Sequence, residues 1–210
     1  MDTHLLLVRH GECIGNIEGR LSGHTDFDLT PNGFAQAELL ASRLLPENIN
    51  IIYSSPLKRA VTTANIIAQI CKIDSIILDN DLIEINYGVC DGMSWIDIDK
   101  IYPNVRKDWK ETYHYPINIP KQESFENCQK RMIRVIETIL SNNFGKTICI
   151  ISHGLVLGSF QCYLHNVPFE HLYKLKLYNN TAFSIINYKN KKYDIIIEAE
   201  DNHLYGSITG

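Results

Sequence analysis

The sequence predicts an α/β protein whose mostly parallel sheet is covered by helices on both faces, a three-layer α/β/α sandwich with an antiparallel hairpin at one edge. Short apolar runs typical of buried strands alternate with stretches whose apolar residues recur at helical spacing. Such alternation favours a parallel sheet between two layers of helices. Near the carboxyl terminus, two strand-like runs joined by a polar turn at residues 189–192 add the hairpin.

The strands and helices follow one another along the whole chain. The predicted strands cover residues 5–8, 50–54, 76–79, 147–151, 181–188 and 193–198. The predicted helices run from Pro31 to near Pro46, from Pro56 through Cys71, over residues 122–142 with Gly145 as the stop, and over residues 155–164. Thr30 and Ser55 each precede a proline, so both are expected to cap a helix.

Two segments do not fit this alternation. Residues 11–28 form a long glycine-punctuated loop, and a loop of this length usually has a function. Between Glu84 and Pro120, aromatic residues and prolines replace the regular pattern, which predicts a cap with short helices. We therefore expect one domain over residues 1–210 with a cap insertion at about 84–120. The cap aromatics are Trp95, Tyr102, Trp109, Tyr113 and Tyr115.

Composition excludes several classes of protein. The 210 residues carry 20 basic and 24 acidic side chains, and a net charge of -4 argues against broad electrostatic binding of nucleic acid. The amino terminus lacks a signal peptide, and no apolar run is long enough to span a membrane. The six cysteines are scattered without a C-x-x-C pair, as expected of reduced thiols. We expect a cytoplasmic monomer or homodimer without membrane partners.

Two distant strands end in the same way. Residues 8–11 read Val-Arg-His-Gly, and residues 151–154 read Ile-Ser-His-Gly. The carboxyl ends of parallel strands lie on one rim, where ligands bind in open α/β sheets, so His10 and His153 can converge there. Arg59 begins a helix just after another strand, and Glu84 also follows a strand end. Basic residues are unfavourable at a helix start unless an anion docks there.

A pocket of two arginines, two histidines and one carboxylate suits a phosphoryl group. Guanidinium groups bind phosphoryl oxygens through paired, charge-assisted hydrogen bonds. One imidazole can attack phosphorus and the other can stabilise the transferring group. Glu84 can protonate the departing alkoxide and later activate water. We expect a phosphomonoester as the small-molecule partner and no cofactor.

Several motifs together resemble the signature of the histidine phosphatase (phosphoglycerate-mutase-like) superfamily. They run in order over three quarters of the chain: residues 7–12 with Asn16, Ser22-Gly23, residues 28–37, residues 53–60, Glu84 with Tyr87-Gly88, and residues 152–154. The resemblance implies His10 as the nucleophile, Glu84 as acid/base, and a phosphate pocket of Arg9, Arg59 and His153. It also implies that Asn16, Ser22, Gly23, Tyr87 and Gly154 contact the substrate or its phosphate.

The branch within the superfamily is set by departures from the mutase pattern. Mutases of this superfamily usually carry Asn after the second His-Gly and a double arginine in the cap, whereas this chain has Leu155 and Arg106-Lys107. Residues 120–125 resemble the Pro-Gly-Gly-Glu-Ser stretch of the small phosphatases. We therefore expect a metal-independent phosphatase, with a cofactor-dependent phosphoglycerate mutase as the alternative. Tyr87 is the main feature that is still compatible with a mutase.

Two further alternatives remain beside these. A metal enzyme is disfavoured because the eight histidines show no short ligand spacing, so no metal site is predicted. His24 and His114 are candidates for the rim of the substrate pocket. A non-catalytic phospho-ligand scaffold on the same fold is the other alternative, because fold does not imply function. All five catalytic candidates are present, which favours an enzyme.

Overall fold

The structure of the protein, a computed structural model, describes residues 2–103 and 119–205. Its centre is a six-stranded sheet in the order β3-β2-β4-β1-β5-β6. The strands are β1 (Thr3–Arg9), β2 (Ile51–Ser54), β3 (Ile76–Leu78), β4 (Thr147–Ser152), β5 (Phe183–Lys189) and β6 (Lys192–Glu200). The first four run parallel to one another, and β5 is antiparallel to β1 and to β6.

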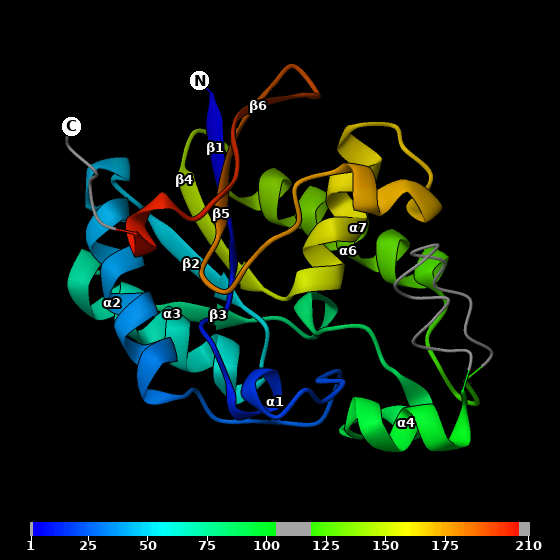
Figure 1. Ribbon diagram of the computed structural model, residues 1–210. Coiled ribbons are helices and arrows are strands. Elements are labelled where there is room, and N and C mark those ends of the chain that lie inside the picture. Colours follow the sequence, from blue (N-terminus) through cyan, green and yellow to red (C-terminus); the bar gives the residue numbers. More distant parts are fainter. Residues whose placement is uncertain (1, 104–118, 206–210) are drawn as a thin grey trace.

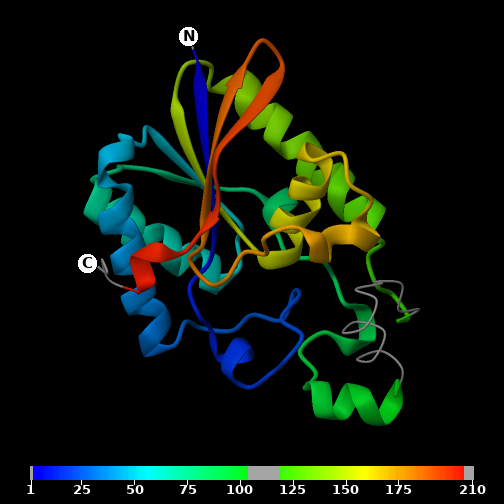
Figure 2. The same cartoon turned by 45° about the horizontal axis from the view of Figure 1, so that its top comes forward.

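Helices cover both faces of this sheet, as Figures 1 and 2 show. The longer helices are α2 (Pro31–Leu44), α3 (Lys58–Cys71), α6 (Phe125–Asn142) and α7 (Gly154–Leu164). Helices α2 and α3 lie on one face, and α6 and α7 lie on the other. The short helices α1 (Ile14–Ile17) and α4 (Trp95–Ile101) lie beyond the carboxyl ends of the parallel strands.

Successive side chains of β1 pack alternately into the two hydrophobic cores on either face of the sheet. Leu5 and Leu7 belong to the core on the α6/α7 side, while Leu6 and Val8 belong to the core on the α2/α3 side. All four are buried because β1 lies inside the sheet and successive side chains point to opposite faces. A strand covered on both faces reads as the continuous apolar run seen in the sequence.

The predicted three-layer sandwich with its antiparallel edge is therefore confirmed. The hairpin closes through Asn190 and Lys191, which both have positive φ (51° and 60°), as a tight two-residue turn requires. Thr30 is the N-cap of α2, where its hydroxyl accepts from the Gly33 N–H at 3.0 Å. Among the described residues, no helix combines the length and the apolar character needed to cross a membrane.

Three local expectations are corrected. The loop over residues 11–28 contains the short helix α1, because Asn16 side-chain and Cys13 backbone bonds close one turn. Helix α3 begins at Lys58 with Leu57 as its N-cap, so Ser55 does not cap it. Helix α6 ends at Asn142, ahead of Gly145, whose positive φ of 76° belongs to the turn into β4.

The predicted cap is described in part. Residues 84–103 hold α4, and residues 119 and 120 lead toward α6, which begins after the N-cap Ser124. Residues 104–118 lie outside the described residues, so the expectations for Arg106-Lys107, Trp109, Tyr113, His114 and Tyr115 are not addressed by the structure.

Candidate active site

Two histidines meet where β1 and β4 end. Arg9 and Ser152 are opposite each other in the parallel register, so the next residue on each strand, His10 and His153, reaches the same level. Their ring centroids are 5.1 Å apart, with 60° between the ring planes. Both residues are buried, at 3% and 0% exposure. The predicted convergence of the two imidazoles on one rim is what the structure shows.

His10 is oriented by its own loop. Its Nδ1 lies 2.7 Å from the Gly11 carbonyl oxygen, and because a carbonyl can only accept, Nδ1 carries the proton. The neutral ring then has its lone pair on Nε2. The His10 carbonyl accepts from the Thr181 N–H and the Asn180 side-chain amide, each at 3.2 Å. Backbone and ring are thus both held, while Nε2 has no hydrogen bond to any residue that the structure describes.

Close glycine packing sets the path of the loop behind His10. A Cβ on Gly33 would lie 2.0 Å from the Glu12 carbonyl oxygen, and one on Gly11 would lie 2.6 Å from the Gly33 carbonyl oxygen. No side chain fits at these distances. The two glycines therefore let the loop lie directly against the start of α2.

Arg59 is a buried cation held by carbonyl oxygens. It is 0% exposed, and its Nη atoms donate to Thr25 at 3.0 Å, Ser22 at 2.9 Å and Gly23 at 2.7 Å. These three acceptors come from the loop that the sequence left without regular structure. The carbonyl groups of this loop therefore orient the side chain of Arg59, which lies on the first turn of α3.

An acid occupies the helix start that the sequence singled out. The Lys58 N–H donates to Asp26 Oδ1 at 2.8 Å, so a carboxylate of this chain takes the place expected for a docked anion. The Lys58 ammonium is exposed and lies 3.6 Å from Asp28. Of the Lys-Arg pair, only Arg59 points into the protein.

Arg9 and Glu84 complete the cluster, close enough to each other to interact electrostatically. Arg9 donates from Nη1 to the Tyr178 carbonyl at 2.6 Å, and its guanidinium lies beside Gly154, where a Cβ would be in ordinary contact 3.5 Å from Arg9 Cζ. Glu84 is 6% exposed and sits at the amino end of α7. Its carboxylate accepts from the Leu155 and Val156 N–H groups, both at 3.2 Å. The helix start that carries Gly154 therefore holds the carboxylate.

His153 is held by a residue that sequence reasoning assigned elsewhere. Its Nε2 lies 2.7 Å from the Ser55 hydroxyl, at the end of β2. The same hydroxyl accepts from the Leu57 N–H at 3.3 Å, one residue before α3 begins, so Ser55 joins the imidazole to the turn that leads into the helix. The position of Ser55 at a strand end on the same rim is the signal that could have identified it.

The cluster strongly disfavours further positive charge. Burial, then Arg59 and Arg9, lower the pKa of His10 well below its ordinary value. Burial is also the main cause of the well-lowered pKa of His153, followed by Arg59 and His10. Burial lowers the pKa of both arginines, against which Glu84 acts on each. The two imidazoles are therefore neutral beside two buried cations.

Three buried nitrogen atoms of this cluster have no hydrogen-bond partner among the described residues: Arg9 Nε, Arg59 Nε and His153 Nδ1. Folded proteins satisfy nearly all buried polar groups, and those left over call for an explanation. Here all three are nitrogen atoms of neighbouring residues, and the arginine atoms are donors. Unpartnered donors beside two buried cations favour an oxygen-rich anion as the ligand of this cluster.

The remaining predicted contact residues line the same region. Asn16 Oδ1 accepts from the Asn180 amide at 3.2 Å, which connects it to the His10 carbonyl through a shared donor. Ser22 and Gly23 bind Arg59 through their carbonyls. A Cβ on Gly23 would lie 2.7 Å from the Tyr87 ring, so Tyr87 packs directly on the glycine. Direct contact of these residues with substrate stays a prediction.

Sequence reasoning missed two further polar residues. Asn180 bridges the His10 carbonyl and Asn16, and Asp91 accepts from the His24 and Thr25 N–H groups at 2.6 and 2.9 Å. Asp91 thereby fixes the loop whose carbonyls hold Arg59. His24 is exposed, and its Nε2 lies 3.0 Å from the Glu84 carbonyl, so it lies against the segment that carries Glu84; its entry into a substrate pocket stays a prediction. No local motif marks Asn180 or Asp91, because each acts across a long stretch of chain.

A comparison with models of protein families shows the family to which the chain belongs. The model of the histidine phosphatase superfamily (branch 1) matches residues 5–199. The chain belongs to this superfamily. The resemblance seen in the motifs is therefore confirmed over nearly the whole chain.

Individual members of the superfamily agree in length and fold. Phosphoserine phosphatase 1 of Hydrogenobacter thermophilus is 31% identical over 90% of this chain and 88% of its own. Probable phosphoglycerate mutase GpmB of Yersinia pestis is 32% identical over 87% and 84%. The structure of Bacillus stearothermophilus YhfR is 29% identical, with a TM-score of 0.89 over 96% of this chain and 99% of that one.

This histidine phosphatase is accordingly an enzyme of the phosphomonoesterase type, as the sequence predicts. Mutases are also among its relatives, so the mutase alternative keeps a place in the experiments below. Within the described residues, no three His, Cys, Asp or Glu side chains gather as a set of metal ligands.

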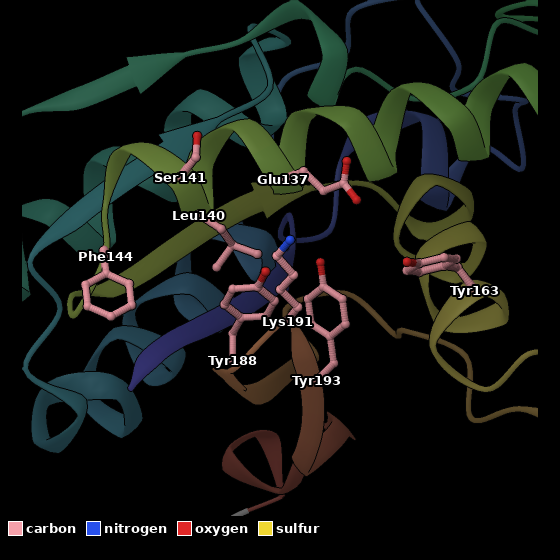
Figure 3. A pocket seen from close by; sticks show the side chains of 8 residues that line it. All are labelled: Glu137, Leu140, Ser141, Phe144, Tyr163, Tyr188, Lys191 and Tyr193. Atoms are coloured by element: carbon pink, nitrogen blue, oxygen red, sulfur yellow. The ribbon is translucent and has the colours of Figure 1, made fainter. Parts of the chain in front are cut away.

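A separate pocket lies at the opposite end of the sheet. It has a volume of about 400 Å³ and lies between the end of α6, Tyr163 of α7 and the β5–β6 turn (Figure 3). Tyr188, which lines it, pairs with Thr3, at the end of β1 away from Arg9. The other lining residues are Glu137, Leu140, Ser141, Phe144, Lys191 and Tyr193.

Proposed function

We propose that this protein hydrolyses small phosphomonoesters in two steps, through a phosphohistidine formed on His10. The observation that carries the proposal is the set of three unpartnered buried nitrogens, on Arg9, Arg59 and His153, beside an imidazole whose Nε2 keeps its lone pair. Together they provide donors for an anion and a nucleophile at one place. Transfer of the phosphoryl group of a monoester requires both of these, donors for its oxygen atoms and a nucleophile for its phosphorus.

Charge compensation supports the binding step. Two buried guanidinium groups without full compensation oppose any further cation and attract a phosphate dianion. Transfer of a phosphoryl group depends mainly on positioning and on stabilising charge on its equatorial oxygens. Arg9, Arg59 and His153 supply this stabilisation. If the Ser55 hydroxyl donates to His153 Nε2, the imidazole proton stays on Nδ1, where it can donate to a phosphoryl oxygen.

The chemical steps follow from the same atoms. His10 Nε2 attacks phosphorus while the bond from phosphorus to the ester oxygen breaks. Glu84, as a carboxylic acid, gives its proton to the departing alkoxide. A water molecule then attacks the phosphohistidine, Glu84 takes the proton from that water, and phosphate leaves His10 with its lone pair restored.

The relatives narrow the choice of substrate. Phosphoserine phosphatase 1 of Hydrogenobacter thermophilus makes O-phospho-L-serine the first compound to test. Water as the acceptor is favoured over a second substrate because Leu155 follows Gly154, where mutases usually carry Asn. We also propose that the cap, at about residues 84–120 of a single domain, sets specificity, with Asn16, Ser22, Gly23, Tyr87 and Gly154 near the bound ester.

Location and assembly extend the proposal. All six cysteines are free thiols, which suits a cytoplasmic protein because the cytosol keeps thiols reduced. A monomer or a homodimer is expected, to be measured by light scattering.

The deciding experiment measures phosphate release from a panel of phosphomonoesters with a chelator present. The panel contains O-phospho-L-serine and 3-phosphoglycerate, and isomerisation to 2-phosphoglycerate is followed in the same samples. We expect release from one or a few compounds without isomerisation. Isomerisation faster than release would replace the phosphatase with a mutase, and activity in neither assay would favour a non-catalytic scaffold.

A further inference from the structure

The segment that carries Glu84 is irregular, so something outside it must hold the carboxyl group in place. Residues 83–86 belong neither to a helix nor to a strand. The Glu84 side chain accepts from Ile85, Leu155 and Val156 N–H groups, which orient the carboxylate. Along the backbone, the Ser152 hydroxyl donates to the Leu82 carbonyl at 2.8 Å and His24 Nε2 lies 3.0 Å from the Glu84 carbonyl, which leaves Ile83 and Asn86, on either side of Glu84 and Ile85, to be held by other groups. A general acid must meet the ester oxygen within about 3 Å, so a small displacement of this backbone is costly.

One arginine of α6 grips this backbone on the amino side of Glu84. Arg131 Nη1 donates to the carbonyl oxygen of Ile83 at 2.6 Å and to that of Asp81 at 2.8 Å. Ile83 immediately precedes Glu84. The planar guanidinium has a fixed fork of donors, which is why it can bridge two carbonyls and still have donors to spare.

A glutamate grips the same segment on the carboxyl side. The remaining Arg131 donors, Nε and Nη2, pair with the two carboxylate oxygens of Glu123 at 2.8 and 3.0 Å. Glu123 Oε2 also accepts from the Asn86 N–H at 3.3 Å, and the Glu123 N–H donates to the Asn86 carbonyl at 2.9 Å. Asn86 lies two residues after Glu84. The side chains of Arg131 and Glu123 are mostly buried, with 11% and 19% exposure.

Helix α6 also holds the second partner of the carboxylate. Gln129 Nε2 donates to the Ser159 carbonyl at 2.8 Å, which links α6 to α7, the helix whose first N–H groups bind Glu84. Side chains of α6 therefore bind both the segment that carries the Glu84 carboxyl group and the helix that supplies its N–H donors. The bidentate Glu123 partner also compensates the charge of Arg131, so this arginine acts on position without leaving an unpaired cation beside the acid.

From this geometry we infer that Arg131 and Glu123 form a clamp that positions Glu84 for proton transfer to the leaving group. Arg131 and Glu123 are positioning residues, since neither contacts the reacting atoms in this arrangement. The inference rests on the proposed role of Glu84 as the acid and adds the residues that make this role effective. A merely structural ion pair would have no effect that depends on the leaving group.

The test compares two substrates that differ in their need for an acid. An alkyl phosphate, O-phospho-L-serine or glycerol 2-phosphate, releases a strongly basic alkoxide, while p-nitrophenyl phosphate releases a stable phenolate. The quantity compared in every variant is kcat/KM, which reports the steps up to phosphohistidine formation and leaves out the shared hydrolysis step. In R131M, we expect kcat/KM for the alkyl phosphate to fall about ten-fold more than kcat/KM for the aryl phosphate. R131K keeps the positive charge but only some of the hydrogen-bond donors of the guanidinium group. Its extra loss with the alkyl phosphate should therefore be smaller than that of R131M.

Arg134 offers a matched control on the same helix. It contacts the same segment only through the Asp81 carboxylate, at 2.7 Å, and its side chain is 66% exposed. R134M should change both activities by less than about two-fold, as expected for an exposed pair. If R131M does not fold, E123Q tests the other half of the clamp, and a smaller loss in the same direction is expected.

The E84Q variant separates the two ways to fail. Selective loss with the alkyl phosphate in E84Q, but equal losses or no loss in R131M and E123Q, would overturn the clamp and leave the acid role intact. Equal losses on both substrates in E84Q would overturn the acid role and the clamp together. Selective loss in E84Q, R131M and E123Q, absent from R134M, supports the clamp.

Discussion

The two ends of the sheet differ in what their polar atoms have to bind. At the carboxyl ends of β1 and β4, buried nitrogens of Arg9, Arg59 and His153 have no partner among the described residues. At the opposite end, tyrosine rings surround a pocket of about 400 Å³ (Figure 3). Tyr163 and Tyr188 contact Tyr193 with ring centroids 6.3 and 5.0 Å away.

This difference teaches that a hollow alone does not mark a catalytic site. Burial, with help from Tyr163, Tyr188 and Glu137, raises the pKa of Tyr193, so its hydroxyl stays neutral and offers no nucleophile. At the other end, burial lowers the pKa of His10 and keeps its imidazole in the neutral form. Uncompensated charge beside a neutral nucleophile is the chemical signature, and the predictions below test whether activity follows it.

The largest effect is expected from removal of the nucleophile. H10A should lower turnover more than a hundred-fold, because it removes the proposed acceptor of the phosphoryl group, and His153 is held by Ser55 in a different role. The fold should persist, since the change removes a desolvated ring without breaking a strand. Phosphate release measures activity, and circular dichroism with thermal unfolding measures the fold. Residual activity above about a hundredth of wild type would contradict the nucleophilic role.

Loss of Arg59 should affect both activity and stability. R59M leaves the carbonyls of Ser22, Gly23 and Thr25 without their donor, and unsatisfied buried acceptors destabilise a fold by about 1–3 kcal/mol each at most. We expect about 2–4 kcal/mol lower free energy of unfolding and at least a hundred-fold loss of kcat/KM. Chemical denaturation and steady-state kinetics measure the two. Full stability in R59M would show that the loop does not depend on this cation.

An effect of intermediate size is expected on acidification. The pKa values of His10 and His153 are lowered in the folded protein, so below about pH 6.5 the unfolded chain binds more protons than the folded one. Stability is therefore present above that pH and is lost as the pH falls from it toward the folded-state pKa values. Each group contributes up to about 1.4 kcal/mol per pH unit in that window.

The measurement is the free energy of unfolding at pH 7.5 and 5.5 in buffers without phosphate. H10N serves as the comparison, because it removes one of the two titrating rings and should flatten the dependence. Equal slopes in wild type and H10N would show that His10 does not contribute to the acid sensitivity.

The smallest effect is expected at the amino end of the sheet. Y163A enlarges the tyrosine pocket but lies far from the histidines, so kcat and KM should stay within about two-fold of wild type. Tyr163 is 41% exposed, and the expected loss of stability is about 1 kcal/mol. A ten-fold fall in kcat with the fold intact would show that the two ends are coupled.

Much of the site could be predicted because its residues follow strand ends. Arg9-His10 and Ser152-His153 continue two buried apolar runs, and the parallel register alone brings their imidazoles to one level. Arg59 could be placed from the first turn of its helix. The parts that could not be predicted act through backbone carbonyls or across long separations, as Ser55 and Asn180 do.

The sequence by itself determined the order of strands and helices, the alternation of β1 between two cores, and the chemical identity of the rim. These depend on local periodicity and on side-chain type, which are written in the chain. Only the tertiary structure decided that the Ser55 hydroxyl contacts an imidazole, that backbone carbonyls of the 11–28 loop hold Arg59, and that Arg131 binds the backbone beside Glu84. Each of these depends on hydrogen bonds between residues 34 to 98 positions apart. Local periodicity carries no information about such contacts, because folding alone brings the partners together.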